Sequence, residues 1–178
     1  LLHRLRREEQ AAQEQAEAAM TLSTAQGFPL WLAFGMILRG GTLAAQGQAA
    51  EGIAQIRSGL AAFQATGAEV GRPYFLTLLA EVYGPGEQAE ERLSILDKAL
   101  SAVQKTGERW YEAERHRLKG ELLLALSADH QAEAETCFQQ ALDVAPRRQG
   151  VDLVEHQQSV LLLDAEFLQH VEDGADLL

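Results

Sequence analysis

The residues best suited to chemistry are concentrated between Thr106 and Leu126. This stretch, TGERWYEAERHRLKGELLLAL, holds a Trp, a Tyr, a His, four Glu, three Arg and a Lys. Imidazole and carboxylate groups act as general acids and bases in enzymes and as ligands of metal ions. The stretch is therefore either the site of an enzyme or one copy of a structural repeat.

Metal chemistry would need His and carboxylate residues on one helix face. Three pairs have the i, i+4 spacing that achieves this: Glu112/His116, Asp152/His156 and Glu166/His170. Each pair supplies two ligands, whereas catalytic zinc needs a third, and the Glu-x-x-His spacing of di-iron bundles does not occur. Ordinary surface pairing is favoured, with a shared metal site as the alternative for the last two pairs.

Covalent and nucleotide chemistry find equally little support. Cys137 is the only cysteine, and it lies beside Phe138 with no basic cluster nearby in sequence, which favours a buried structural thiol over a nucleophile. No serine stands in a GxSxG motif, and the P-loop and GxGxxG motifs are absent. We therefore expect no enzyme, no catalytic, cofactor-binding or metal-binding residues, and no cofactor.

The composition is that of a helical, acidic protein. Of the 178 residues, 47% are hydrophobic and only 6% aromatic, and the formal net charge is −11, which disfavours nucleic acid and membrane partners. The sequence contains no run of 18 apolar residues and no signal peptide, and a single cysteine suits a cytoplasmic setting. The opening LLHRLRREEQ lacks Met and is in helical register, which indicates a fragment of a larger protein.

An internal repeat indicates which structural elements position these residues. Gly27, Gly67 and Gly107 lie forty residues apart, as do Gly40, Ala80 and Gly120. Matches at the same spacing continue further along: Ile56 with Leu96, Gly59 with Ala99, and Leu60 with Leu100. This period predicts one domain over 1–178, made of a half repeat 1–26, full repeats 27–66, 67–106 and 107–146, and a divergent capping helix 147–178.

Each period is predicted to hold two amphipathic helices. The expected helices are 3–24, 28–46, 49–65, 70–84, 88–105, 108–126, 130–145 and 151–172. Short turns make consecutive helices antiparallel, with Gly107 as a left-handed cap. The small residues on the forty-residue grid predict close helix contact, so a large residue at Gly40 or Gly120 should destabilise the fold by a few kcal/mol.

The residues that repeat resemble those of a known family. The pattern is Gly40–Leu43–Gly47–Gly52–Ile56–Gly59–Leu60, Ala80–Tyr83–Leu96–Ala99–Leu100 and Gly120–Leu123–Ala134–Phe138–Ala141–Leu142. It resembles the tetratricopeptide repeat (TPR), although the usual Trp, Pro and shorter period are missing. The resemblance implies an all-α fold, a right-handed α-solenoid of antiparallel hairpins with seven or eight helices.

A narrower resemblance covers residues 4–145. The segments GQAAEGIAQIRSGLAAFQATGAEVGRPYFLTLLAEVYG and KTGERWYEAERHRLKGELLLAL look like the C-terminal repeat arrays of large bacterial signalling proteins. Those proteins carry a class III adenylate or guanylate cyclase domain, or a transcriptional-regulator domain, with a predicted ATPase module. No cyclase, P-loop or DNA-binding motif lies in this chain, so the parent's activity does not carry over to it.

In tetratricopeptide folds the first helices line a concave groove, and the resemblance places three rows there. The rows are Phe34, Tyr74 and Glu114; Ile37, Thr77 and Arg117; and Gly41, Glu81 and Glu121. Arg72 and Arg117 would suit an acidic peptide end, and Glu81, Glu114 and Glu121 a basic one. These rows vary between repeats as a binding surface would, although any solvated face would vary too.

The sequence thus favours a non-catalytic interaction or scaffold module of a signal-transduction protein. Its partner would be a protein or peptide, or another domain of its own parent. Self-association into a homodimer is the first alternative, because a solenoid end exposes an apolar helix face. A small-ligand sensor is the second alternative.

Overall fold

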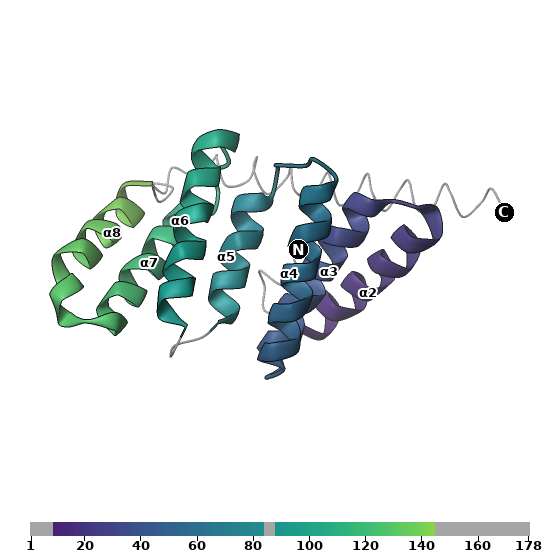
Figure 1. Ribbon diagram of the computed structural model, residues 1–178, viewed down its shortest axis with the longest axis horizontal. Coiled ribbons are helices and arrows are strands. Elements are labelled where there is room, and N and C mark those ends of the chain that lie inside the picture. The colour runs from purple at the N-terminus through teal and green to yellow at the C-terminus, as the bar shows by residue number, and fades with distance from the viewer. Residues whose placement is uncertain (1–8, 84–87, 145–178) are drawn as a thin grey trace. The chain divides into compact units, whose positions relative to one another are not determined.

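The computed structural model describes residues 9–83 and 88–144, and within them every regular element is a helix (Figure 1). The prediction of an all-α protein is confirmed for this part of the chain. Its helices are α2 (Glu9–Gln26), α3 (Pro29–Ala45), α4 (Ala49–Ala65), α5 (Arg72–Val82), α6 (Ala89–Thr106), α7 (Glu112–Leu126) and α8 (Gln131–Val144), with the short 3-10 turn η1 (Ala128–His130) before α8. The predicted helix 151–172 lies outside the described residues.

Glycines on the forty-residue grid end the helices in the same way. Gly27, Gly67 and Gly107 have φ angles of 70°, 78° and 74°, in the left-handed region that glycine adopts without strain. The Gly107 N–H donates to the Val103 carbonyl oxygen at 2.8 Å, so the predicted left-handed cap is confirmed. The sequence period is therefore also a period of backbone conformation.

Glycines bring the two helices of the α3–α4 hairpin into backbone contact. A Cβ atom on Gly40 would lie 2.7 Å from the Gly52 carbonyl oxygen, and one on Gly59 would lie 3.1 Å from that of Ala33. Early residues of α3 thus meet late residues of α4, which makes the two helices antiparallel. Side chains larger than hydrogen do not fit at these contacts, so the expected close packing of small residues is confirmed here.

The other neighbouring helices are joined by different contacts. Gly35 of α3 lies against Met20 of α2, and the Nε of Arg92 in α6 donates to a backbone carbonyl of α5 at 3.0 Å. Gly120 of α7 faces the ring of Phe138 in α8. In addition, α4 packs on α5 and α6 packs on α7. Each described helix is therefore held by its neighbours in the chain.

Two hydrophobic clusters form the core of the described residues. The larger runs from α2 to α7, and its bulkiest fully buried apolar side chains are Phe75, Ile37, Ile56, Leu78 and Leu96. The smaller lies between α7 and α8 and contains Leu123, Ala134 and Cys137. Burying each large apolar side chain contributes about 1.5–3 kcal/mol, so the larger cluster supplies most of the stability.

One hydrogen-bonded cap links two repeats. Gly71, with φ of 88°, precedes α5, and no side chain from its own turn caps that helix. Its N–H donates instead to both carboxylate oxygens of Glu108, at 2.8 and 2.9 Å. A negative charge at a helix N-terminus is favourable because it opposes the positive end of the helix dipole. The start of α5 is therefore stabilised by the turn that precedes α7.

The chain divides into two units, Leu1–Asp143 and Val144–Leu178. All described residues except Val144 belong to the first unit, and the predicted capping segment 147–178 lies outside them. None of the helices in the described ranges combines the length and the apolar character that a membrane crossing requires.

Candidate functional site

The first predicted groove row, Phe34, Tyr74 and Glu114, is divided between the surface and the core. Phe34 and Glu114 are half-buried, whereas Tyr74 is only 3% exposed. The Tyr74 ring centroid lies 5.0 Å from that of Trp110 and 5.2 Å from that of Tyr111. Its predicted place in an open groove is therefore corrected, because rings of the next repeat cover it.

The second predicted row needs a similar correction. Ile37 is fully buried, and its Cγ1 atom occupies the space that a side chain on Gly59 would take. Thr77 is also fully buried, and its hydroxyl donates to the Pro73 carbonyl oxygen at 2.9 Å. Both residues belong to the core, so only Arg117 of this row reaches the surface.

The third predicted row begins with the buried Gly41 and offers two carboxylates. The half-buried Glu81 accepts a hydrogen bond from the Tyr111 hydroxyl at 3.0 Å. Burial, followed by the nearby charge of Glu81, raises the pKa of Tyr111 well above its usual value. Glu121 is exposed and pairs with Arg117. The acidic surface expected for a basic partner is thus already engaged within the chain.

Arg117 does not act as a free cation. Its guanidinium donates to both carboxylate oxygens of Glu114, at 2.5 and 2.8 Å, and also to Glu121. The hydrogen bonding of Arg117 to Glu114 is the main reason that the pKa of Arg117 is raised. Because two carboxylates already surround this charge, Arg117 is poorly suited to the acidic peptide end predicted for it.

Six aromatic side chains form a continuous series along the first helices, which we call the aromatic chain. Its members are Trp31, Phe34, Phe75, Tyr74, Trp110 and Tyr111, and neighbouring ring centroids lie 5.0–5.9 Å apart. Tilted and edge-on ring pairs at such distances are favourable. Four of these rings are only partly buried: Trp31, Phe34, Trp110 and Tyr111. The aromatic chain therefore combines a packed interior with accessible rings.

Part of the aromatic chain was not apparent in the sequence. Trp110 and Tyr111 correspond on the forty-residue grid to Val70 and Gly71, so no repeat counterpart pointed to a shared row. Their position directly before α7, next to the start of α5 in space, follows from the packing of neighbouring hairpins. The adjacent pair of large aromatic residues was the only available signal.

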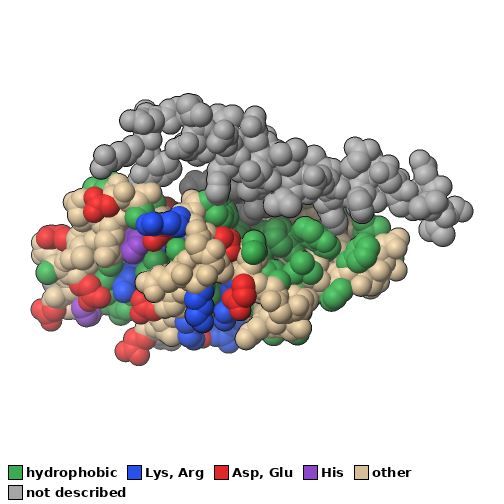
Figure 2. Space-filling view, turned by 90° about the horizontal axis from the view of Figure 1, so that it is seen from above, with side chains coloured by type: hydrophobic (Ala, Val, Ile, Leu, Met, Phe, Trp, Pro, Cys, Tyr) green, Lys and Arg blue, Asp and Glu red, His purple; other side chains and the backbone are tan. Residues whose placement is uncertain are grey.

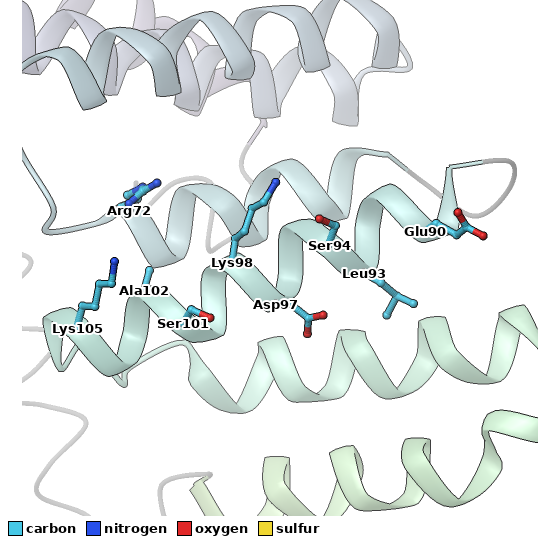
Figure 3. A pocket seen from close by; sticks show the side chains of 9 residues that line it. All are labelled: Arg72, Glu90, Leu93, Ser94, Asp97, Lys98, Ser101, Ala102 and Lys105. Carbon is cyan, nitrogen blue, oxygen red and sulfur yellow. The ribbon is translucent and has the colours of Figure 1, made fainter.

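A hollow of about 600 Å3 lies along α6, and we call it the α6 hollow (Figure 3). It is lined by Arg72, Glu90, Leu93, Ser94, Asp97, Lys98, Ser101, Ala102 and Lys105. Arg72 comes from the first turn of α5, and its ion pair with the exposed Glu69 is long, at 3.4 Å. The predicted cation Arg72 therefore shares a surface with Lys98 and Lys105, which the sequence had not singled out.

The reactive-looking residues of α7 and α8 are held in structural roles. Glu112 pairs with Arg109 at 2.6 Å rather than with His116. Burial lowers the pKa of His116, and its Nδ1 atom has no hydrogen-bond partner. Cys137 is buried as predicted, and burial raises the pKa of its thiol although Lys119 lies near. A raised pKa keeps this sulfur protonated and unreactive.

The surface differs between the two ends of the described residues. In Figure 2, hydrophobic side chains gather over the right of the view, where α2 and α3 lie, whereas charged side chains gather on the left, toward α7 and α8. In residues 9–83 and 88–144, no group of three or more His, Cys, Asp or Glu side chains is placed to hold a metal ion.

Comparison with family models, with curated proteins and with solved structures finds no match to this chain.

Proposed function

We propose that this chain is a non-catalytic interaction module, a right-handed α-solenoid of TPR-like hairpins whose first helices bind a protein segment. The observation that carries the proposal is the aromatic chain, because it connects the first helices of successive repeats in one series. The forty-residue recurrence of the left-handed glycines supports the solenoid reading.

The aromatic chain has the properties of a binding surface. Binding energy at protein interfaces concentrates in a few aromatic and Arg anchors that lie in well-packed surroundings. Phe34 is such an anchor, since its ring is held edge-on by Phe75 at 5.0 Å while part of it stays accessible. Glu114 and Glu121 lie on α7, but Arg117 already engages both, so recognition would come from the rings rather than from these charges.

The wider setting follows from the resemblance alone. A repeat array of this kind would serve as a scaffold or regulatory region in a larger cytoplasmic bacterial signalling protein. Its partner would be another protein or a further domain of the same parent.

Selection of peptides on the immobilised chain tests the proposal. Peptides chosen from a random displayed library should lose most of their binding to Phe34→Ser and keep it on Val70→Ser. Val70 is the matched control, because it is 77% exposed and lies outside the aromatic chain. Circular dichroism must show both variants folded. Equal retention on the two variants would contradict a role for the first helices.

Self-association is the second candidate function, and exposed leucines at α7 and α8 favour it. Leu142 is 70% exposed, Leu124 46% and Leu126 37%. Two copies that covered each other's leucines would remove this apolar surface from water. Sedimentation equilibrium should then show a dimer that Leu142→Glu converts to monomer. A wild-type chain that stays monomeric at all concentrations excludes this candidate.

A further inference from the structure

We propose that the α6 hollow is a separate binding site for an extended acidic peptide with carboxylates three residues apart. The site goes beyond the proposed function, because it lies on a second helix and shares no residue with the aromatic chain. Its cationic members are Arg72, Lys98 and Lys105.

Unpaired charge is the first observation. Lys98 and Lys105 are the only Lys or Arg side chains in residues 9–83 and 88–144 that make neither a hydrogen bond nor an ion pair there. All other described cations contact a carboxylate, a carbonyl or both. Both unengaged lysines line the same hollow, on a chain whose formal net charge is −11.

The acidic residues of the α6 hollow do not neutralise these lysines. Asp97 pairs with Lys119 of α7 at 2.9 Å, and Figure 3 shows Asp97 extending away from the side that Lys98 and Lys105 reach. Glu90 lies at the opposite end of the hollow from Lys105. The end formed by Arg72, Lys98 and Lys105 is therefore cationic.

The spacing of the two lysines selects the shape of the ligand. They are seven residues apart on α6, which is close to two helical turns and about 10.5 Å along the axis. In Figure 3 both side chains, with Arg72, reach toward the same side of α6. A polyproline-type extended peptide rises about 3.1 Å per residue with three residues per turn. Its residues i and i+3 share one face about 9.3 Å apart, which matches the lysine pair.

The remaining lining suits a peptide better than a small anion. Leu93 and Ala102 provide apolar surface, Ser101 provides a hydroxyl group between the two lysines, and Ser94 provides another on the Glu90 side of Lys98. A hollow of about 600 Å3 is large enough for several residues of an extended chain. A single inorganic anion offers one centre of charge, whereas two linked carboxylates offer one partner for each lysine.

Fluorescence anisotropy with two labelled peptides tests this site on the full chain. Both peptides are proline-rich and contain two aspartates, three residues apart in one and adjacent in the other. We expect the spaced peptide to bind at least about fivefold tighter, and salt to weaken its binding through screening. Equal affinity of the two peptides overturns the proposal.

Single variants locate the binding. Lys98→Gln and Lys105→Gln should each weaken the binding of the spaced peptide at least threefold. Arg109→Gln is the matched control, because it removes one exposed positive charge outside the hollow and should leave affinity unchanged. Equal losses in all three variants would indicate only a general charge effect and would overturn the site.

Two further arms separate the alternatives. Submillimolar inorganic phosphate should displace the spaced peptide only if the site holds a single anion. Such displacement, together with equal affinity for the two peptides, would therefore identify a single-anion site instead. Phe34→Ser should leave binding of the spaced peptide unchanged. Binding that depends on the lysines but not on Phe34 therefore supports this site even where the proposed function of the first helices fails.

Discussion

The α3–α4 and α7–α8 hairpins carry a glycine at the same repeat position but use it differently. A Cβ on Gly40 would meet backbone atoms, the Gly52 carbonyl oxygen at 2.7 Å and the Ile56 nitrogen at 2.9 Å. A Cβ on Gly120 would meet ring atoms of Phe138 at 2.7–3.0 Å. In the first hairpin glycine allows two backbones to touch, and in the last it makes room for one side chain. Equivalent sequence positions therefore differ in rigidity.

The interiors of the same two regions also differ in polarity. The one fully buried polar side chain of α3 and α4 is the neutral, hydrogen-bonded Thr42, whereas α7 buries the charged Arg115 completely. The Nε and Nη1 atoms of Arg115 have no hydrogen-bond partner, and burial lowers its pKa to about 10. On the forty-residue grid Arg115 corresponds to the fully buried Phe75. The repeat thus specifies where a core position lies without requiring an apolar residue there.

The largest expected difference concerns the side chains opposite the two glycines. Ile56→Ala should destabilise the fold by about 3–4 kcal/mol, because Ile56 is fully buried and leaves a cavity. Phe138→Ala should cost about 2 kcal/mol, because that ring is only half-buried. Urea unfolding measures both values. A larger loss for Phe138→Ala would reverse the proposed order of the two hairpins.

Adding a methyl group at each glycine tests the contacts directly. Gly40→Ala should destabilise by about 2 kcal/mol through overpacking against backbone. Gly120→Ala should change stability by less than about 1 kcal/mol, because the Phe138 ring can move and alanine gains helix propensity. Equal losses in thermal unfolding would contradict the distinction between backbone and side-chain contacts.

Replacing the buried cation of α7 should raise stability. Arg115→Met removes a buried charge that has no ion pair and only one long hydrogen bond, to the Glu108 carbonyl oxygen at 3.5 Å, and should stabilise by about 1 kcal/mol, or about 2–4 °C in Tm. Arg109→Met is the control, since Arg109 is exposed and its replacement should leave Tm nearly unchanged. A clear drop in Tm for Arg115→Met alone would mean that the guanidinium has a stabilising partner in solution.

The smallest expected effect is a pH dependence confined to the last hairpin. Burial lowers the pKa of His116 below its usual 6.5, against the opposing charge of Glu112. The unfolded chain then binds the proton more tightly, so stability from this residue is present above pH 6.5 and is lost as pH falls through the folded-state pKa. His116→Gln should reduce the loss in urea midpoint between pH 7 and pH 5. If His116→Gln leaves the loss in urea midpoint unchanged, His116 is not the source of that loss.

The helices could be predicted well from the sequence because their signals are local. The predicted helices from 28–46 to 130–145 each match one observed helix, with ends that differ by at most four residues. Left-handed glycines and amphipathic spacing are properties of a few adjacent residues, and these fix helix ends before any tertiary contact.

The candidate site was harder to predict because exposure depends on neighbouring repeats. Residues 73–80 of α5 are all buried, so counting along one helix could not separate groove from core. The engagement of Arg117 was readable, since Glu114 and Glu121 lie at i−3 and i+4. The α6 hollow could not be predicted from the sequence, because Arg72 joins Lys98 and Lys105 only through the packing of α5 on α6.

The hydrogen bond from the Gly71 N–H to the Glu108 carboxylate makes the Gly71 amide a probe of the following repeat. The Gly71 amide proton exchanges with solvent only when the turn before α7 moves away from α5. Its hydrogen exchange rate therefore measures how often the later hairpin opens while α5 stays folded. In a chain ending at Thr106 this protection would be lost, and the start of α5 would fray. The repeat that begins at Gly107 thus completes the one before it, which couples the unfolding of these two repeats.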